Sequence, residues 1–258
     1  MRSHPLAMRA LSLIAVLCAL GLWWAAAANE WVSALFVPSP QQVWAAFLDI
    51  AREGYKGSPL AVHVGESLYR LGSAFLLALV TALPLGLLSG RIAWIRAITE
   101  PFIEFYRPLP PLAYYTLLVL WLGIDNGSKI ALLYLAAFAP LYLAVVSGVS
   151  RVSKDRIHAA QSLGSGRWKV FVYVMLPSCL PEIFTGIRTS LGIAYTTLVA
   201  AEMVAAVSGV GWMVLDASKF LRSDIIFVGI ILMGLIAVAI DGGIRWLERR
   251  IVPWSGKE

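Results

Sequence analysis

The stretch DRIHAAQSLGSGRWKVFVYVMLPSCLP, residues 155–181, decides the fold, because it is a cation-rich segment between two long apolar runs. Asp155 is expected to cap a short helix, since its carboxylate can accept hydrogen bonds from the free N–H groups of a first helical turn. Gly164 suits a chain reversal after that helix, because glycine tolerates a positive φ. A second helical piece follows, and Pro177 and Pro181 are expected to interrupt it, since proline lacks an N–H. We therefore predict an amphipathic elbow that docks against another surface.

The composition places most of the chain in a membrane. Of the 258 residues, 59% are hydrophobic and 14% are charged, whereas a soluble domain is about one quarter charged. The net charge of +6 does not indicate nucleic acid, because the cations stand at the ends of apolar runs. Cys18 and Cys179 fit neither a disulfide framework nor a zinc site, so both are expected to be packing residues.

Six apolar runs predict an all-α membrane protein with about six transmembrane helices. The first run, residues 10–28, resembles a signal peptide but is long enough to span a bilayer, and we expect it to be retained as a membrane helix. Residues 41–52 predict a short amphipathic helix, with Val43, Trp44, Phe47, Leu48 and Ala51 on one side. The remaining spans are residues 67–90, 108–124, 130–149, 183–207 and 225–246, with a polar turn at 125–129 and a polar-aromatic connection at 208–224.

The distribution of lysine and arginine predicts the orientation. If the N-terminus is cytoplasmic and six spans follow, fifteen of the 21 Lys and Arg residues lie on the cytoplasmic side, Arg107 and Arg188 among them. The positive-inside rule then favours two cytoplasmic termini and a cytoplasmic elbow. Asp241, near the inner end of the sixth span, is expected to pair with Arg245 at i+4. The other side holds Arg52, Lys56, Arg70, Lys129, Lys219 and Arg222.

Catalytic motifs are absent from the sequence. His4, His63 and His158 form no HExxH, and no GxSxG is present. Residues 164–169, GSGRWK, lack the GxxxxGK[ST] spacing of a phosphate-binding loop, and no strand is predicted before them. We therefore expect no catalytic residue, no metal site and no cofactor bound by this chain, and any uphill transport must draw its energy from a partner or an ion gradient.

Polar groups inside the predicted spans are candidates for a solute pathway. Glu202 stands within the fifth span, where an ionisable group is costly and by default functional; the alternatives are a place near the outer interface or a pair with a neighbouring helix. Tyr195, Thr196 and Thr197 could line the pathway, although threonine also bonds back to its own helix. Arg107, which precedes three prolines, marks either a broken helix at a gate or a simple helix boundary.

The elbow resembles the signature loop of importer-type ABC transporter permeases. In that family Glu-Ala-Ala is followed by Gly, and then by an aliphatic residue and Leu-Pro. Ala159, Ala160, Gly164 and the segment VMLP at 174–177 keep this spacing, and His158 stands in place of the Glu. Residues 105–124, 159–177 and 186–204 are similar to the nitrate, sulfonate and taurine branch of the family, and most similar to its taurine permeases. The resemblance covers residues 66–250.

The resemblance implies a type I ABC importer permease fold. Residues 1–65 would hold the first membrane helix and the periplasmic amphipathic helix, residues 66–250 the transmembrane domain, and residues 251–258 a cytoplasmic tail. The elbow would be a coupling helix seated in a cleft of a cytoplasmic ATPase. His158 can donate a hydrogen bond there but cannot replace a permanent anion. The loop residues carried over from the family pattern are Asp155, His158, Ala159, Ala160, Gly164, Leu176 and Pro177.

The resemblance also implies partners and a solute. A second permease copy, cytoplasmic ATP-binding subunits that use ATP, and a periplasmic solute-binding protein would assemble with the chain in a bacterial inner membrane. Residues 41–52 and 208–224 are candidates for docking the binding protein. The solute would be taurine or a similar alkanesulfonate, with nitrate or another small anion as the alternative.

Three other interpretations stay open from the residues alone. The elbow could be a plain interfacial helix. A secondary transporter needs binding groups near the midplane and often two related halves, and the sequence offers only Glu202 and no repeat. An intramembrane enzyme needs paired catalytic groups inside the spans, and none pair by spacing.

Overall fold

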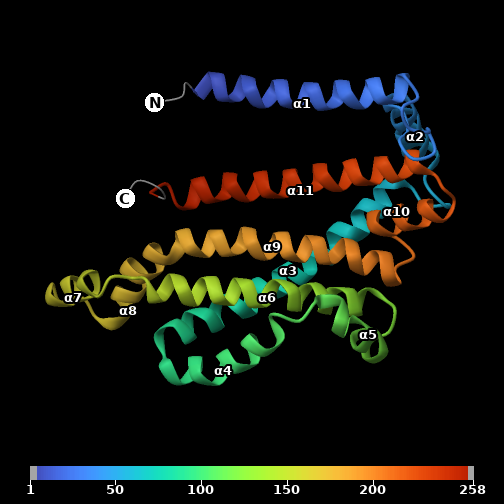
Figure 1. Ribbon diagram of the computed structural model, residues 1–258. Coiled ribbons are helices and arrows are strands. Elements are labelled where there is room, and N and C mark those ends of the chain that lie inside the picture. The colour runs from blue at the N-terminus through green and yellow to red at the C-terminus, as the bar shows by residue number, and fades with distance from the viewer. Residues whose placement is uncertain (1–4, 255–258) are drawn as a thin grey trace.

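The computed structural model describes residues 5–254, which form helices and no named strand (Figure 1). Five of the described helices are long and apolar enough to cross a membrane, which confirms the all-α membrane fold. The long helices are α1 (Pro5–Ala28), α3 (Leu60–Arg91), α6 (Asn126–Ser150), α9 (Leu176–Ala205) and α11 (Ser223–Ile251). The shorter ones are α2 (Pro40–Glu53), α4 (Ala93–Tyr106), α5 (Pro111–Leu122), α7 (Lys154–Ser162), α8 (Arg167–Val170) and α10 (Val210–Lys219). Arg2, His4 and Lys257 lie outside the described residues.

The long helices run side by side, so the bundle has two ends (Figure 1). We call the end that holds α7 and α8 the inner end, and the end that holds α2, α5 and α10 the outer end. The start of α1 and the end of α11 both lie at the inner end. The elbow and the two ends of the described chain are therefore on one side, as the distribution of cations predicts.

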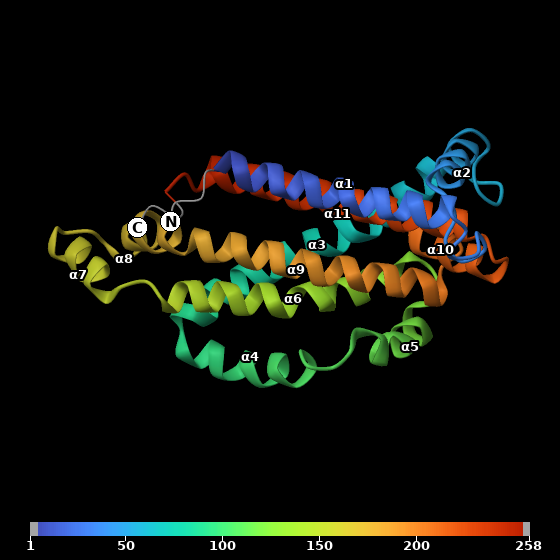
Figure 2. The same cartoon turned by 45° about the horizontal axis from the view of Figure 1, so that its top comes forward.

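The third crossing is made by two short helices. α4 runs from the inner end back along the bundle, and α5 completes the passage to the outer end (Figure 2). Their 14 and 12 residues span only about 21 and 18 Å at 1.5 Å per residue. Arg107 stands in the break between them, so its assignment to the cytoplasmic side is wrong, and the crossing begins before residue 108. The hydropathy of the sequence does not predict α4 as part of the crossing, because Arg96 and Glu100 lower the mean hydropathy of this segment. In the structure these two charges pair with each other at 2.9 Å.

The centre of the bundle is α6, with α3 on one side and α9 on the other. Gly86 and Gly90 of α3 are four residues apart and let α6 approach closely. A Cβ on them would lie 2.8 Å from Cβ of Val145 and 2.6 Å from Cβ of Val149 respectively. A Cβ on Gly186 of α9 would lie 2.3 Å from a side-chain atom of α6. Small residues at such crossings allow close van der Waals packing where lipid removes the hydrophobic driving force.

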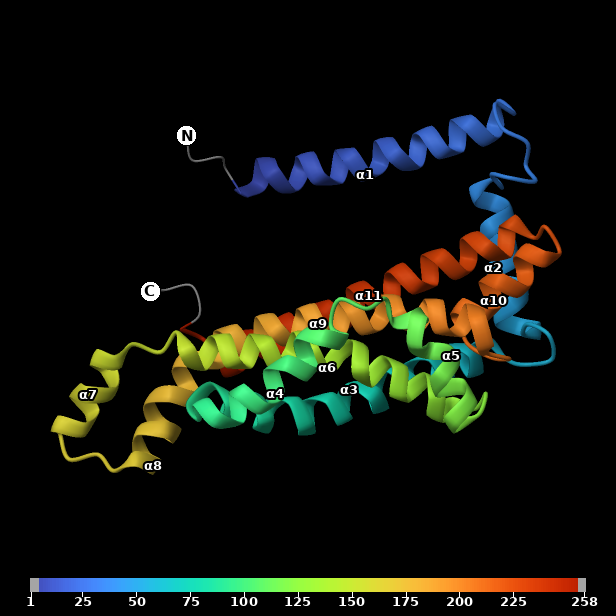
Figure 3. The ribbon, with the colours of Figure 1, turned by 60° about the horizontal axis from the view of Figure 1, so that its bottom comes forward.

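α1 stands apart from the bundle (Figure 3), and none of its span from Ala10 to Ala28 is buried. Near the outer end, Trp23 stacks on Phe227 of α11 with ring centroids 5.6 Å apart and donates to the Pro38 carbonyl at 3.0 Å. Cys18 is exposed on α1, so the expectation that it is a packing residue is wrong, because this helix has no neighbour there to pack against. Cys179 of α9 is buried, as expected.

The outer-end helix α2 confirms the predicted amphipathic helix but turns a different face inward. It buries Val43, Ala46 and Ile50, while Trp44 and Ala51 are exposed. The three buried positions follow the i, i+3, i+7 spacing of one helical face. The predicted face was wider and included residues that are exposed in the structure. The polar-aromatic connection at 208–224 contains α10, and residues 126–129 form the first turn of α6 and not the predicted polar turn.

Candidate functional site

The elbow projects beyond the inner end of the bundle as α7 and α8 (Figure 1). No residue of α7 is buried, and Leu163 at its end is 87% exposed. Ser153 is the N-cap residue of α7, so the prediction that Asp155 caps this helix is wrong. Asp155 lies in the first turn, where its negative charge favours the helix dipole. The projecting helix is thus free to meet another surface.

Gly164 ends α7 as the sequence predicts. Its φ is +81°, in the left-handed region that favours glycine. The N–H of Gly164 donates to the Gln161 carbonyl at 2.9 Å, and the N–H of Ser165 donates to the Ala160 carbonyl at 3.1 Å. These two bonds form a Schellman motif, which satisfies the last free carbonyls of the helix and reverses the chain.

The prolines after the elbow do not interrupt the helix, contrary to prediction. The backbone widens to a π-helix over Phe171–Met175 and then continues into α9. Pro177 stands in the first turn of α9 and Pro181 lies one turn further on. The wider turn accommodates the missing N–H and the crowding that a proline ring imposes on the preceding turn. One rod, Arg167–Ala205, therefore runs 39 residues from the elbow to the outer end.

The predicted loop residues separate into two groups. Asp155, His158 and Ala159 are exposed on α7, whereas Leu176 and Pro177 are half-buried at the base of the elbow, where the rod enters the bundle. The base is also fixed by an ion pair, which Arg151 after α6 makes with Glu182 of α9. The structure therefore places an exposed helix, α7, beyond a base that an ion pair between α9 and the residue after α6 holds in place.

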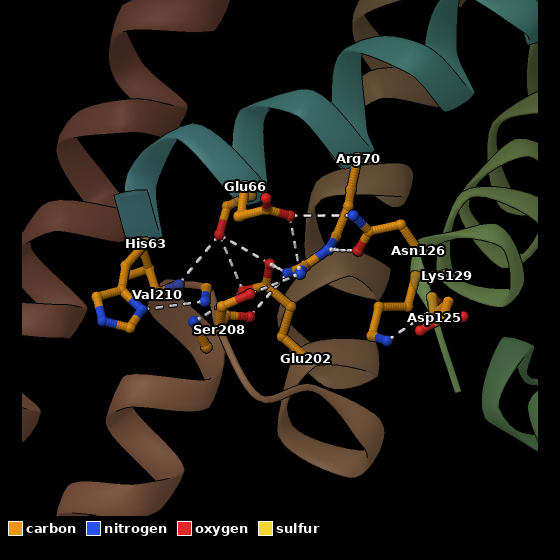
Figure 4. A network of polar contacts seen from close by, with 12 residues as sticks. His63, Glu66, Arg70, Asp125, Asn126, Lys129, Glu202, Ser208 and Val210 are labelled. Atoms are coloured by element: carbon orange, nitrogen blue, oxygen red, sulfur yellow. Dashed lines mark hydrogen bonds and ion pairs between the residues drawn. The ribbon is translucent and has the colours of Figure 1, made fainter. Parts of the chain in front are cut away.

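A network of buried charges joins the helices at the outer end (Figure 4). Arg70 of α3 is 2% exposed and Glu202 of α9 is 1% exposed. The Arg70 Nη1 atom donates to Glu202 Oε1 at 2.7 Å, and its Nε donates to Asn126 Oδ1 of α6 at 2.7 Å. Arg70 also pairs with Glu66 at 3.2 Å. A buried guanidinium needs such partners, because desolvation is costly for a charge that stays unpaired.

The first turn of α10 is capped by side chains from other helices. Its N-cap is Gly209, which has no side chain to accept the free N–H groups. The φ of Gly209 is +121°, and a Cβ there would lie 2.4 Å from the Glu202 carboxylate, so only glycine fits. Glu202 therefore fixes α10 to α9 as well as pairing with α3. The donor–acceptor pairs are Gly209 N with His63 Nδ1 at 3.2 Å, Val210 N with Ser67 Oγ at 3.0 Å, and Gly211 N with Glu202 Oε2 at 2.9 Å.

The other predicted pathway residues lie along α9 and in the break of the third crossing. Tyr195 donates to the Met233 carbonyl of α11 at 2.7 Å and so bridges the two helices. Thr196 and Thr197 each donate to the Ile193 carbonyl, at 2.9 and 2.8 Å, as in the back-bonding alternative. The structure brings Tyr195 and Glu202 onto one helix, while Arg107 stands in the separate segment between α4 and α5.

The sequence reasoning missed Arg188 as a site residue. It lies 12 residues into α9, about 18 Å along the helix, so it is inside the crossing and not on the cytoplasmic side as the count of cations placed it. Its Nε donates to Asp241 Oδ1 of α11 at 3.0 Å. Asp241 also holds Arg245 at 2.5 Å, which confirms the predicted i, i+4 pair. An arginine within one apolar run and an aspartate within another is the signal that could have found it.

The outer surface carries a second polar group around Tyr55, between α2 and α3. The Tyr55 hydroxyl donates to Asp216 Oδ2 of α10 at 2.8 Å. Burial raises the pKa of Tyr55 above its ordinary value, and the bond to the Asp216 carboxylate adds to this effect. Lys56 pairs with Asp216 at 3.7 Å and lies 4.2 Å from the centre of the Phe220 ring. These contacts hold α10 against the start of α3.

Comparison with known proteins agrees with this architecture. The family model described as binding-protein-dependent transport system inner membrane component matches residues 82–253. The chain is 45% identical to the taurine transport system permease protein TauC of Escherichia coli (strain K12), over 92% of this chain and 87% of that one. It is 34% identical to the putative aliphatic sulfonates transport permease protein SsuC of Bacillus subtilis (strain 168), over 96% and 87%.

A solved structure shares the fold. Inward facing conformations of the MetNI methionine ABC transporter superpose with a TM-score of 0.57 at 19% identity, over 71% of this chain and 93% of that chain. This likeness, with the helices described above, gives the chain the type I ABC importer permease fold. The chain therefore belongs to the family of binding-protein-dependent transport system inner membrane components, the ABC transporter permeases.

Proposed function

We propose that this chain is the membrane-spanning subunit of an ATP-driven importer that carries taurine or a similar alkanesulfonate into the cytoplasm. The observation that carries the proposal is the 45% identity with a taurine permease over 92% of the chain. Nitrate or another small anion is the second candidate, because the same branch handles several anions.

The partners follow from the same proposal. Two copies of the chain form one pathway in a bacterial inner membrane, with both termini in the cytoplasm. Cytoplasmic ATP-binding subunits bind and hydrolyse ATP, and this chain itself binds no cofactor. A periplasmic binding protein delivers the solute to the outer end. The exposed Trp44 of α2 and Phe220 after α10 are its proposed contacts.

The elbow is the proposed mechanical link to ATP. α7 carries no buried residue, so it can seat in a cleft of the ATP-binding subunit. A displacement of α7 reaches the rod Arg167–Ala205 through the short connection at 163–166, where Gly164 reverses the chain, and the rod itself stays helical through the π-helical turn. At the far end, Glu202 connects that rod to α10 and α3. Movement at the inner end is thereby transmitted to the outer end.

The test is transport by the reconstituted assembly. The permease, its ATP-binding subunits and the binding protein are placed in vesicles, and uptake of labelled taurine is measured with unlabelled taurine, ethanesulfonate or nitrate as competitor. The proposal expects saturable uptake that both sulfonates compete and nitrate does not. Competition by nitrate alone would favour the second candidate, and no uptake of any of these anions would overturn the proposal.

A further inference from the structure

Cavities follow the seam between α9 and α11 from the inner end to the outer end. Their volumes fall from about 390 Å³ through about 230 Å³ to about 10 Å³. The first and second share Arg188 in their linings, and the second and third share Tyr195. The third ends against Glu202 and Gly211. The three cavities therefore lie one after another along the seam, with the largest at the inner end and the smallest beneath the outer network.

The cavity at the inner end carries a net positive charge. Its lining includes the three guanidinium groups of Arg188, Arg245 and Arg249, and the carboxylate of Glu248. Asp241 lines the second cavity and pairs with both Arg188 and Arg245. Three cations against two carboxylates leave one positive charge in excess. Arg245, Glu248 and Arg249 belong to the last two turns of α11 at the inner end, whereas Arg188 lies further inside the crossing, where a charge is costly and commonly marks a solute or ion path.

Arg188 is the cation best placed to hold an anion. It is common to the first two cavities, and it is 40% exposed although it lies within the crossing. If Arg188 turns from Asp241 to an anion, the carboxylate keeps Arg245 at 2.5 Å and is not left unpaired. A guanidinium presents two parallel N–H groups, which suit two oxygens of a sulfonate. The exchange is therefore possible without leaving a bare charge in the seam.

We infer that the α9–α11 seam of each copy lines the inner half of the solute pathway, and that Arg188 binds the sulfonate group of the solute there. Beyond Arg188 the second cavity is apolar up to Tyr195, with Leu191, Ile240 and Ile244 in its lining. A short alkyl chain fits this lining, and the ammonium of an aminoalkanesulfonate would meet Asp241. This inference rests on the proposed function and names the residue that recognises the solute class.

The first test changes the charge at position 188. Arg188→Gln is expected to lower taurine uptake on the order of tenfold, the loss of one charge-assisted hydrogen bond to the anion, while ATP hydrolysis by the assembly persists. Arg188→Lys, which keeps the charge but not the two parallel N–H groups, is expected to retain more uptake than Arg188→Gln. The matched control is Arg96→Gln, since Arg96 is also paired with a carboxylate on a crossing helix and is 44% exposed; it should transport as the wild type.

The second test measures access to the seam. Gly192 lines the second cavity, and a Cβ there meets no atom within 4 Å. In a Cys18→Ser background, Gly192→Cys is treated with a thiol reagent that carries a sulfonate, using the permease and its ATP-binding subunits in lipid nanodiscs. Labelling that taurine slows, and that Arg188→Gln also slows, is the expected result. The control is Gly234→Cys on α11, which has the same open space and is exposed outside these cavities.

The outcomes separate the two proposals. If wild-type vesicles carry no taurine, the proposed function fails. If they carry taurine but Arg188→Gln carries it equally well, or taurine slows the labelling of Gly192→Cys no more than that of Gly234→Cys, the seam inference is overturned. An anionic lipid headgroup offers the same chemistry as a sulfonate. If phosphatidylglycerol and not taurine protects Gly192→Cys, Arg188 is a lipid site and the inference is also overturned.

Discussion

Arg70 on α3 and Glu202 on α9 are 132 residues apart in the sequence, yet their side chains meet at 2.7 Å with almost no exposure to solvent. The pair is surrounded by Ser67, which donates to both Glu202 oxygens at 2.8 and 3.0 Å, and by the start of α10. Glu202 therefore depends on Arg70 for its compensation, and Arg70 depends on Glu202 together with the more exposed Glu66. The outer ends of α3 and α9 and the start of α10 are fixed to one another at this point.

Glu202→Gln should destabilise the protein by about 3 kcal/mol, because the buried Arg70 would lose its nearer, buried carboxylate and keep only Glu66, which is 35% exposed. The measurement is thermal unfolding of the purified permease in detergent. The double variant Arg70→Met/Glu202→Met should lose less stability than Arg70→Met and Glu202→Met added together, since neither of these two buried charges is then left without the other. A loss in the double variant equal to the sum of the two single losses would show that Arg70 and Glu202 are not coupled.

Gly209→Ala should cost more stability than Gly57→Ala. Both glycines have a positive φ, +121° and +80°, so both substitutions strain the backbone. A Cβ at Gly57 meets no atom within 4 Å, whereas a Cβ at Gly209 would lie 2.4 Å from the Glu202 carboxylate. The difference between the two variants in thermal unfolding isolates that contact. Equal shifts for both would mean that the contact is relieved at no cost.

Gly90→Val should separate α3 from α6, because a Cβ at Gly90 already lies 2.6 Å from Cβ of Val149. Overpacking of this kind costs about 1–3 kcal/mol. Gly72→Val on the same helix is the control, since a Cβ there meets no atom within 4 Å. Thermal unfolding should show a loss for Gly90→Val alone. A similar loss for Gly72→Val would assign the effect to helix propensity instead of packing.

Gly164→Arg should abolish solute uptake while leaving insertion into the membrane intact. The residue needs a φ of +81° to reverse the chain after α7, and a large cation there would also obstruct seating of the helix. Gly166→Arg is the control, because Gly166 lies in the same connection with a φ of −66° and open space around it. Uptake and membrane content are measured together. Normal uptake by Gly164→Arg would remove the elbow from the mechanism.

Much of the fold could be predicted from the sequence, because long apolar runs must become helices in lipid. The elbow and the chain reversal at Gly164 were also predictable, since a glycine after a polar helix commonly ends that helix with a positive φ. The third crossing was not, because Arg96 and Glu100 make α4 look soluble until their mutual pair is seen. Pro177 and Pro181 predicted a break in the helix, but the π-helical turn before Pro177 lets the helix continue.

The site was only partly predictable, because its partners are distant in sequence. Glu202 stood out as a buried acid, but its pairing with Arg70 and the start of α10 depends on how α3 and α9 cross. Arg188 was counted on the cytoplasmic side, since it lies near the end of the predicted span that begins at residue 183. Asp241 opposite Arg188 on α11 becomes evident only when the two helices are placed side by side.

The central claim is that this chain has no motor and receives movement through α7 from an ATP-hydrolysing partner. The most direct measurement compares taurine uptake by reconstituted vesicles after two treatments, inactivation of the partner's ATP hydrolysis and collapse of the proton gradient with an uncoupler. We predict that the first treatment stops uptake and that the second leaves it unchanged. Uptake that survives without ATP hydrolysis and ends with the proton gradient would contradict the account.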